Sequence, residues 1–230
     1  MPNRVLFNDN IAKWVAGTLL LSGAYRMRKT SDRDHWFLWK SGIVAPVYCN
    51  TRQLISHPQG RFAAMAGLKA AIEQEFPHAE GVIGMATAGI GWAHTLAHLA
   101  DLPAGYIRSA PKDHGLGGLI EYYAASTAKR VVLIDDLVAS GGSIKKACEI
   151  AKATGLEVIG VLSIVNWGFK KMHEELAGLK VKSLVSHAPI IEQLDLDDEA
   201  KRDLQSFYES PSTHQWNSVT FGGPALEMAA

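Results

Sequence analysis

The sequence has little cysteine, no block of one charge and no long hydrophobic run, and each absence excludes a class of protein. Its 230 residues include two cysteines, Cys49 and Cys148, too few and too far apart for a disulfide framework. Basic and acidic residues number 23 each, without the basic block that marks a nucleic-acid-binding arm. No apolar run approaches the roughly 20 residues that cross a bilayer. We therefore expect a cytoplasmic globular protein that binds neither nucleic acid nor membrane.

The most informative segment covers residues 130–143 and reads RVVLIDDLVASGGS. Its apolar, β-branched run at 131–134 is typical of a strand buried on both faces of a parallel sheet. Asp135 and Asp136 follow, at the end of the strand where ligands bind in such sheets. A glycine-containing loop and a helical pattern come next, which together present backbone N–H groups to an anion. The segment predicts a site for a phosphorylated polyol; the alternative is that the acids only cap a strand–helix turn.

Helical and strand patterns alternate through the middle of the chain. The patterns predict a helix at about 60–76, a strand at 82–85, a helix at 91–99, strands at 104–107 and 131–134, a helix to about 154, and a strand at 158–165. A helix near residues 9–19 and two short strands between 37 and 48 precede them, and a helix at 195–208 follows. Such alternation implies an α/β fold with a parallel sheet.

A second group of functional side chains lies in RSAPKDHGLGGLIEY, residues 108–122. Arg108, Lys112 and His114 are cationic or can become so, while Pro111 and the glycines oppose a helix. A long polar loop inside a compact domain is more often a lid or binding loop than an idle connector. The composition suits a lid that closes over pyrophosphate. The alternative is a solvated surface loop.

These segments resemble the motifs of a known family. IDDLVASGGS resembles the phosphoribosyl pyrophosphate (PRPP) signature of type I phosphoribosyltransferases, in which two acids hold the ribose hydroxyls and the loop grips the 5-phosphate. Residues 108–121 resemble the mobile catalytic loop of the orotate phosphoribosyltransferases. FLWKSGIVAPVYCNTRQL at 37–54 resembles their amino-terminal hood, and GMATAGIG at 84–91 stands in the place of their pyrophosphate loop. The motifs occur in the family's order, and weaker similarity extends along most of the chain.

The resemblance implies the type I phosphoribosyltransferase fold, an α/β fold with a central, mainly parallel sheet flanked by helices and a small amino-terminal hood. We expect the amino-terminal helix and hood segment in residues 1–55, the phosphoribosyltransferase core in 56–195, and a carboxyl-terminal helix and tail in 196–230. The resemblance also implies a homodimer, in which the loop at 108–119 reaches into the neighbouring subunit's active site.

By matched position, the resemblance also implies roles for individual residues. Catalysis is expected of Arg108, Lys112, His114 and Asp136. PRPP binding is expected of Lys40, Thr87, Ala88, Asp135, Asp136, Leu137, Val138, Ala139, Ser140, Gly141, Gly142 and Ser143. The base is expected to contact Tyr48, Cys49, Ala139 and Trp167. Magnesium is the expected cofactor, held by substrate oxygens together with Asp135 and Asp136.

The chain departs from the family pattern at several of these positions. Ser109 replaces a lysine that often follows the loop arginine, and Ala88 replaces a lysine of the pyrophosphate loop. Ala139 stands where a threonine often contacts orotate. Asn166 and Trp167 stand where an Asp-Arg pair is common, whose arginine holds the orotate carboxylate. A buried carboxylate needs a cationic or hydrogen-bonding partner, so orotate would require another anchor.

Three functional hypotheses follow. The first is transfer of the phosphoribosyl group from PRPP to orotate, which gives orotidine 5′-monophosphate and pyrophosphate. Lys170, Lys171 or backbone N–H groups of the hood would then hold the orotate carboxylate, unless the two lysines only form a solvated helix face. The second is an enzyme of the same fold that acts on another base. The third is a non-catalytic PRPP-sensing regulator that binds RNA or DNA, which the neutral chain disfavours.

Overall fold

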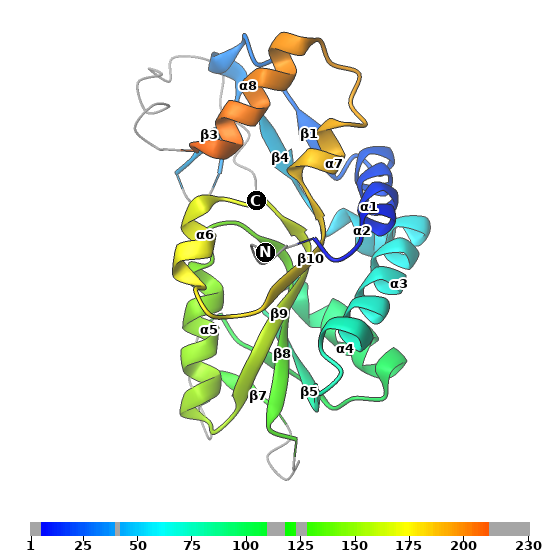
Figure 1. The fold of residues 1–230 in the computed structure, drawn as a ribbon, viewed down its shortest axis with the longest axis vertical. Coiled ribbons are helices and arrows are strands. Elements are labelled where there is room, and N and C mark those ends of the chain that lie inside the picture. Colours follow the sequence, from blue (N-terminus) through cyan, green and yellow to red (C-terminus); the bar gives the residue numbers. More distant parts are fainter. Residues whose placement is uncertain (1–5, 40–41, 110–117, 123–127, 212–230) are drawn as a thin grey trace.

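The computed structural model describes residues 6–39, 42–109, 118–122 and 128–211 and shows an α/β fold (Figure 1). Within these residues, six strands form the central sheet, in the order β10 (Val181–Ser186), β9 (Glu157–Asn166), β8 (Arg130–Val138), β5 (Gly81–Met85), β6 (Ala104–Ile107) and β7 (Ile120–Glu121). All neighbours are parallel except β7, which runs antiparallel to β6 at the edge. The predicted, mainly parallel sheet is confirmed.

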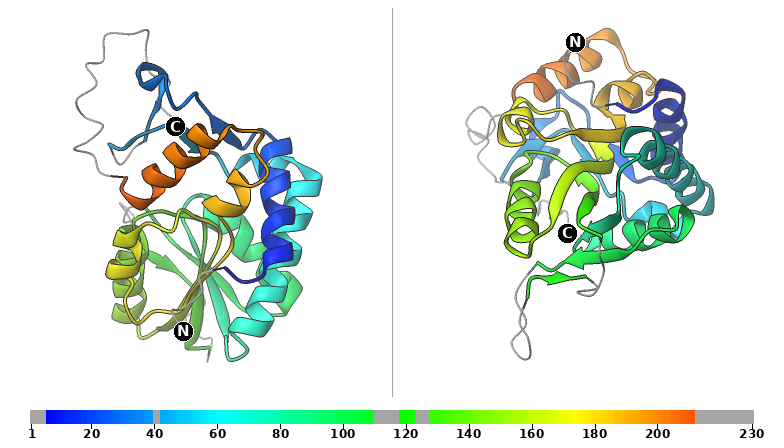
Figure 2. Two further views of the ribbon diagram at one scale, coloured as in Figure 1. Left: turned by 45° about the horizontal axis from the view of Figure 1, so that its top comes forward. Right: turned by 60° about the horizontal axis from the view of Figure 1, so that its bottom comes forward.

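Helices cover both faces of this sheet (Figures 1 and 2). One face carries α1 (Asp9–Leu21), α3 (Pro58–Glu75) and α4 (Ala88–Ala100), and the other carries α5 (Gly142–Ala153) and α6 (Lys170–Glu175). The remaining described helices are short or lie outside these layers: a 3₁₀ turn (Arg33–His35), α2 (Gln53–Ser56), α7 (His187–Ile191) and α8 (Asp198–Glu209). The order of helices and strands in the core follows the alternation in the sequence.

The hood consists of two small antiparallel pairs, β1 (Tyr25–Met27) with β4 (Val47–Cys49), and β2 (Phe37–Leu38) with β3 (Val44–Ala45). These strands lie beyond the carboxyl ends of the central strands, beside α8 (Figures 1 and 2). The sequence pattern indicated strands between 37 and 48 but not β1. The hood therefore sits over the edge of the sheet at which a ligand is expected.

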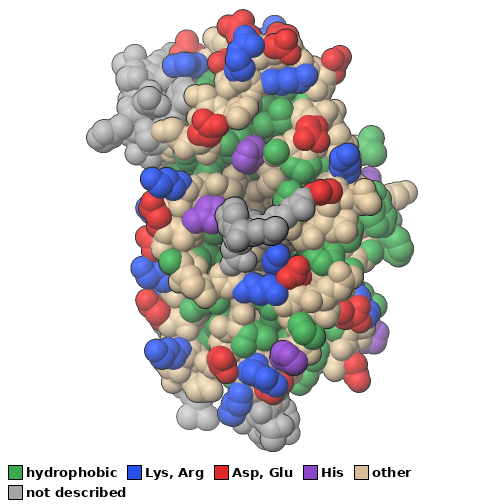
Figure 3. All heavy atoms as spheres, in the orientation of Figure 1, with side chains coloured by type: hydrophobic (Ala, Val, Ile, Leu, Met, Phe, Trp, Pro, Cys, Tyr) green, Lys and Arg blue, Asp and Glu red, His purple; other side chains and the backbone are tan. Residues whose placement is uncertain are grey.

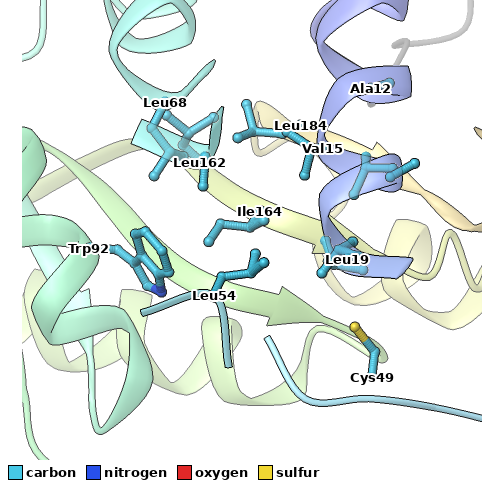
Figure 4. Close-up of a cluster of buried hydrophobic side chains, with 14 of the residues drawn as sticks. Ala12, Val15, Leu19, Cys49, Leu54, Leu68, Trp92, Leu162, Ile164 and Leu184 are labelled. Carbon is cyan, nitrogen blue, oxygen red and sulfur yellow. The ribbon is translucent and has the colours of Figure 1, made fainter. Parts of the chain in front are cut away.

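The core consists of two clusters, one on each face of the sheet, and β8 contributes to both. Val132 and Ile134 belong to the cluster under α1, α3 and α4, whereas Val131 and Leu133 belong to the cluster under α5. Because side chains alternate between faces along a strand, a strand covered on both faces is apolar at every position. Figure 4 shows the first cluster, in which Leu19 of α1 is labelled.

Strand β10 escaped the sequence analysis because polar residues interrupt its pattern. Lys182 pairs with Glu75 of α3 at 3.3 Å, and the Ser183 hydroxyl lies 2.7 Å from that of Ser163 in β9. Partners distant in the sequence thus make these polar side chains compatible with a buried strand. No helix in the described ranges is both long and apolar enough to span a membrane.

Glu80 ties the start of β5 to the start of β8 and predicts a pH-dependent contribution to stability. The N–H groups of Arg130 and Lys129 donate to its Oε2 at 3.0 and 2.7 Å, and the Arg130 guanidinium binds its Oε1 at 2.8 Å. These contacts, the backbone donors first, lower the pKa of Glu80 to about 2. Because the folded pKa lies below the ordinary value of 4.5, the stabilisation is present above about pH 4.5 and is lost as pH falls toward 2.

We expect Glu80→Gln to lower the urea midpoint of unfolding at pH 7, and we expect this difference to shrink steadily as pH falls from about 4.5 toward 2. Glu149→Gln, on an exposed position of α5, is the control and should change the midpoint little at any pH. A deficit of Glu80→Gln that stayed the same at pH 7 and pH 3 would contradict the linkage to this carboxylate.

Candidate active site

Asp135 and Asp136 lie in the last part of β8, at the carboxyl edge of the sheet. The backbone N–H of Asp136 donates to Asp135 Oδ1 at 2.9 Å and so holds the Asp135 carboxyl group in place. Burial, and then the neighbouring Asp136, raises the pKa of Asp135 well above its ordinary range. A cation or a hydroxyl donor that binds here would reduce the repulsion between the two carboxylates. The acid pair is therefore suited to bind a sugar that carries a metal ion.

The loop after β8 presents the start of α5 to the same place. Gly141 has a φ of +83°, a conformation that glycine adopts at little cost. A Cβ there would also lie 3.0 Å from Leu176 Cγ. In the described structure no side chain caps α5, which begins at Gly142, and both Gly142 and Ser143 are exposed. The first N–H groups of the helix and its positive end are thus open to an anion such as phosphate.

The residues after β5 are packed against the acid pair. A Cβ at Gly89, in the first turn of α4, would lie 2.4 Å from the Ile134 carbonyl oxygen and 3.4 Å from Asp135 Cα. Only glycine permits this close approach of α4 to the end of β8. Thr87 is exposed at the start of α4, Ala88 is buried, and the peptide bond before Thr87 is cis. The structure therefore brings the GMATAGIG motif to the acid pair.

The ends of three loops meet around one cavity of about 210 Å³. Ala86 follows β5, Arg108 follows β6, and Ser143 is the second residue of α5; Lys146 of α5 also lies in the cavity wall. Arg108 Nη1 also lies 3.5 Å from Glu121 Oε1 across the β6–β7 hairpin. Lys146 was not singled out in the sequence, because a lysine on an amphipathic helix usually faces solvent.

Three predicted residues, Lys40, Lys112 and His114, lie outside the described residues, so their roles stay predictions. The same holds for most of the loop predicted to cross the dimer interface.

The hood reaches the acid pair through the residues that follow β4. The Thr51 hydroxyl donates to Asp136 Oδ2, and Thr51 is only 2% exposed. Cys49 is also buried; burial, and then Asp136, raises the pKa of its thiol, which therefore stays protonated. Tyr48 alternates to the other face of the strand, where its ring lies 5.7 Å from that of Phe37. Sequence reasoning missed Thr51, since a threonine after a strand has no distinctive local signal.

Trp167 lies in an aromatic cluster that joins the hood to the core. Trp167 is 2% exposed, and its ring stacks on that of Trp39 with centroids 5.6 Å apart. Its backbone N–H donates to the Val138 carbonyl at 3.0 Å. The cluster comprises Tyr25, Trp39, Trp167, Phe169, Phe207 and Tyr208. Trp167, which stands where an arginine is common in the family, is thus an apolar side chain held in place beside the end of β8.

Other residues around the expected base site are placed as follows. Ala139 is half-buried against the core, and Leu137 and Val138 continue β8. Asn166 is fully buried; its Oδ1 accepts the Gly168 N–H at 2.7 Å, and its Nδ2 has no hydrogen-bond partner among the described residues. The side chain of Lys170 is 86% exposed and lies 3.9 Å from Glu174, which corresponds to the alternative of a solvated helix face.

A larger cavity, of about 760 Å³, lies among α6, α7 and α8; its wall includes Lys170, one of the candidate anchors for the orotate carboxylate, but neither acid of the pair. These helices border the face drawn in Figure 3, on which acidic and basic side chains are interspersed. The acid pair, the two loops beside it and the hood define the candidate active site, because they combine carboxylates, an open helix terminus and a cation.

Comparison with known proteins gives a consistent result. Residues 54–199 match the family model of the phosphoribosyl transferase domain. The chain is 36% identical over 186 residues to the orotate phosphoribosyltransferase of Bacillus subtilis, which covers 78% of this chain and 86% of the relative. It is 35% identical over 212 residues to that of Streptococcus pneumoniae serotype 4, with 86% and 99% covered. The crystal structure of orotate phosphoribosyltransferase from Aeropyrum pernix matches with a TM-score of 0.66 and 30% identity, over 78% of this chain and 97% of that one.

Proposed function

The chain belongs to the orotate phosphoribosyltransferase family, and we propose that it transfers the phosphoribosyl group of PRPP to orotate. The products are orotidine 5′-monophosphate and pyrophosphate, an exchange that belongs to pyrimidine biosynthesis. The observation that carries the proposal is the acid pair at the end of β8, followed directly by the uncapped amino-terminal end of α5. This combination suits a ribose that carries a 5-phosphate.

In the proposed reaction a pyrimidine nitrogen displaces pyrophosphate from C1 of the ribose. Asp135 and Asp136 hold the ribose hydroxyls, and backbone N–H groups of residues 138–143 bind the 5-phosphate. Arg108, together with Lys112 and His114, neutralises the negative charge that grows on the leaving pyrophosphate. His114 either pairs with this charge or donates a proton to it.

A magnesium ion fits the donors of the site. Mg²⁺ prefers oxygen ligands and is commonly held by one or two carboxylates together with substrate phosphates. Asp135 and Asp136 supply such carboxylates, whereas the described residues contain no cluster of three or more His, Cys, Asp or Glu side chains able to hold a metal. We propose that oxygens of the substrate and water would supply the other ligands. When bound, the ion would neutralise the charge of the pyrophosphate.

We also propose a homodimer in which the loop at 108–119 acts in the partner's active site. The family resemblance supports this arrangement. Cys49 and Cys148 are both free thiols, which supports a reducing compartment such as the cytoplasm.

The identity of the base that reacts with PRPP distinguishes between the functional hypotheses. We expect release of pyrophosphate when the protein is mixed with PRPP, Mg²⁺ and orotate, and a much smaller release with uracil, adenine or hypoxanthine. Release of pyrophosphate with another base but not with orotate would show that this other base is the substrate. If no base gave release while calorimetry still showed Mg²⁺-dependent uptake of PRPP, the protein would be a sensor and not an enzyme.

A further inference from the structure

We propose that Thr51 is a positioning residue, whose hydroxyl fixes the carboxylate of Asp136 in the orientation that binds the ribose of PRPP. The inference rests on the proposed function, because it concerns the sugar-binding acid of that site. It assigns a role at the active site to a hood residue that none of the sequence motifs singled out.

The contact joins two segments that are 85 residues apart in the sequence. The Thr51 hydroxyl donates to Asp136 Oδ2, while the Asp136 N–H donates to Asp135 Oδ1. The terminal torsion of an aspartate is soft, so a carboxylate held only at its backbone can rotate. With Oδ2 engaged by Thr51, rotation of the carboxylate is restricted, and in this proposal Oδ1 is the atom that accepts a hydroxyl of the sugar.

The backbone around Thr51 is held firmly enough to act as a support. The Leu54 N–H donates to the Thr51 carbonyl at 3.0 Å where α2 begins, and the Asn50 N–H donates to the Ala24 carbonyl at 2.7 Å. Leu54 is fully buried in the core, and Thr51 itself is 2% exposed. A β-branched side chain in such a setting has few rotamers. The hydroxyl is therefore presented from a fixed position.

A second buried threonine shows what a hydroxyl without this role does. Thr18, 5% exposed in α1, donates to the Val15 carbonyl of its own helix at 2.8 Å. Its hydroxyl is satisfied locally, as is usual for a buried threonine in a helix. Thr51 instead uses its hydroxyl on a carboxylate of the candidate site. The two residues thus form a matched pair for experiment.

The test compares Thr51→Val, Thr51→Ser and Thr18→Val with the unsubstituted chain. Calorimetry with PRPP and Mg²⁺ gives the affinity, initial rates give KM and kcat, and urea unfolding gives the stability. We expect Thr51→Val to weaken PRPP binding and lower kcat/KM for PRPP by about tenfold or more, the usual cost of losing a group that orients a ligand-binding side chain. The KM for orotate should change much less. Thr51→Ser should restore most of the affinity, and Thr18→Val should bind PRPP normally.

Two results would overturn the positioning role. One is unchanged PRPP affinity in Thr51→Val. The other is equal loss in the Val and Ser variants together with a lowered urea midpoint, which would mean that Thr51 only supports the fold. Calorimetry needs no turnover, so the proposal is tested even if another base replaces orotate. A failure of the unsubstituted chain to bind PRPP at all would instead overturn the proposed function, and this inference with it.

Discussion

Replacing Asp136 with asparagine is expected to lower kcat/KM for PRPP by roughly 10- to 10²-fold, because a hydrogen bond to a charged group contributes about 1.5–3 kcal/mol and 1.4 kcal/mol is a factor of ten. Asparagine keeps the shape of the side chain and can still accept the Thr51 hydroxyl, but it carries no charge. The substitution therefore isolates the negative charge that we propose to face the sugar and its magnesium ion. Because the two side chains have the same size, we expect the packing of β8 to stay unchanged.

The measurement is the initial rate of pyrophosphate release at fixed Mg²⁺ and varied PRPP. Asp101→Asn is a matched control, because Asp101 is exposed at the end of α4 with a φ of +53°, a conformation that asparagine also tolerates. That variant should keep the unsubstituted rate. Full activity of Asp136→Asn would show that the acid pair does not grip the sugar, and the observation on which the proposed function depends would be lost.

The position of the acid pair could be predicted from the sequence, but the end of its strand could not. An apolar run followed by two acids marks the place where a buried strand leaves the core. The structure extends β8 beyond both acids to Val138, because β9 continues to pair with it as far as Asn166. Pairing between distant strands is a tertiary effect that no local pattern reports.

Thr51 and Lys146 could not be predicted for a related reason. Each belongs to a residue type with an ordinary local interpretation, a turn residue in one case and a solvated helix position in the other. Their places near the acid pair and in the cavity wall arise only when the hood and α5 fold over the same edge of the sheet. The family resemblance likewise predicts that Trp167 lies at the base site, but its burial depends on ring contacts with Trp39 and with α8, which no local pattern reports.

The dependence of the hood on α8 leads to the second large effect, which is on stability. Phe207 of α8 is 1% exposed and meets Trp39 of the hood edge-on, with ring centroids 6.0 Å apart at 85°. It meets Phe169 in the same way, at 6.4 Å and 83°. A ring enclosed by other rings leaves a cavity when it is removed, because large aromatic neighbours cannot collapse into the space.

We expect Phe207→Ala to lower the free energy of unfolding by about 3–5 kcal/mol. Phe62→Ala, the same change on α3 where the side chain is 67% exposed, should cost about 1 kcal/mol or less. Urea unfolding curves with equal m-values measure the difference. Alanine favours a helix over phenylalanine at both positions, so helix propensity cannot explain a larger loss at Phe207. If both variants unfolded at the same urea concentration, the contacts of Phe207 with Trp39 and Phe169 would contribute no more to stability than an exposed phenylalanine does.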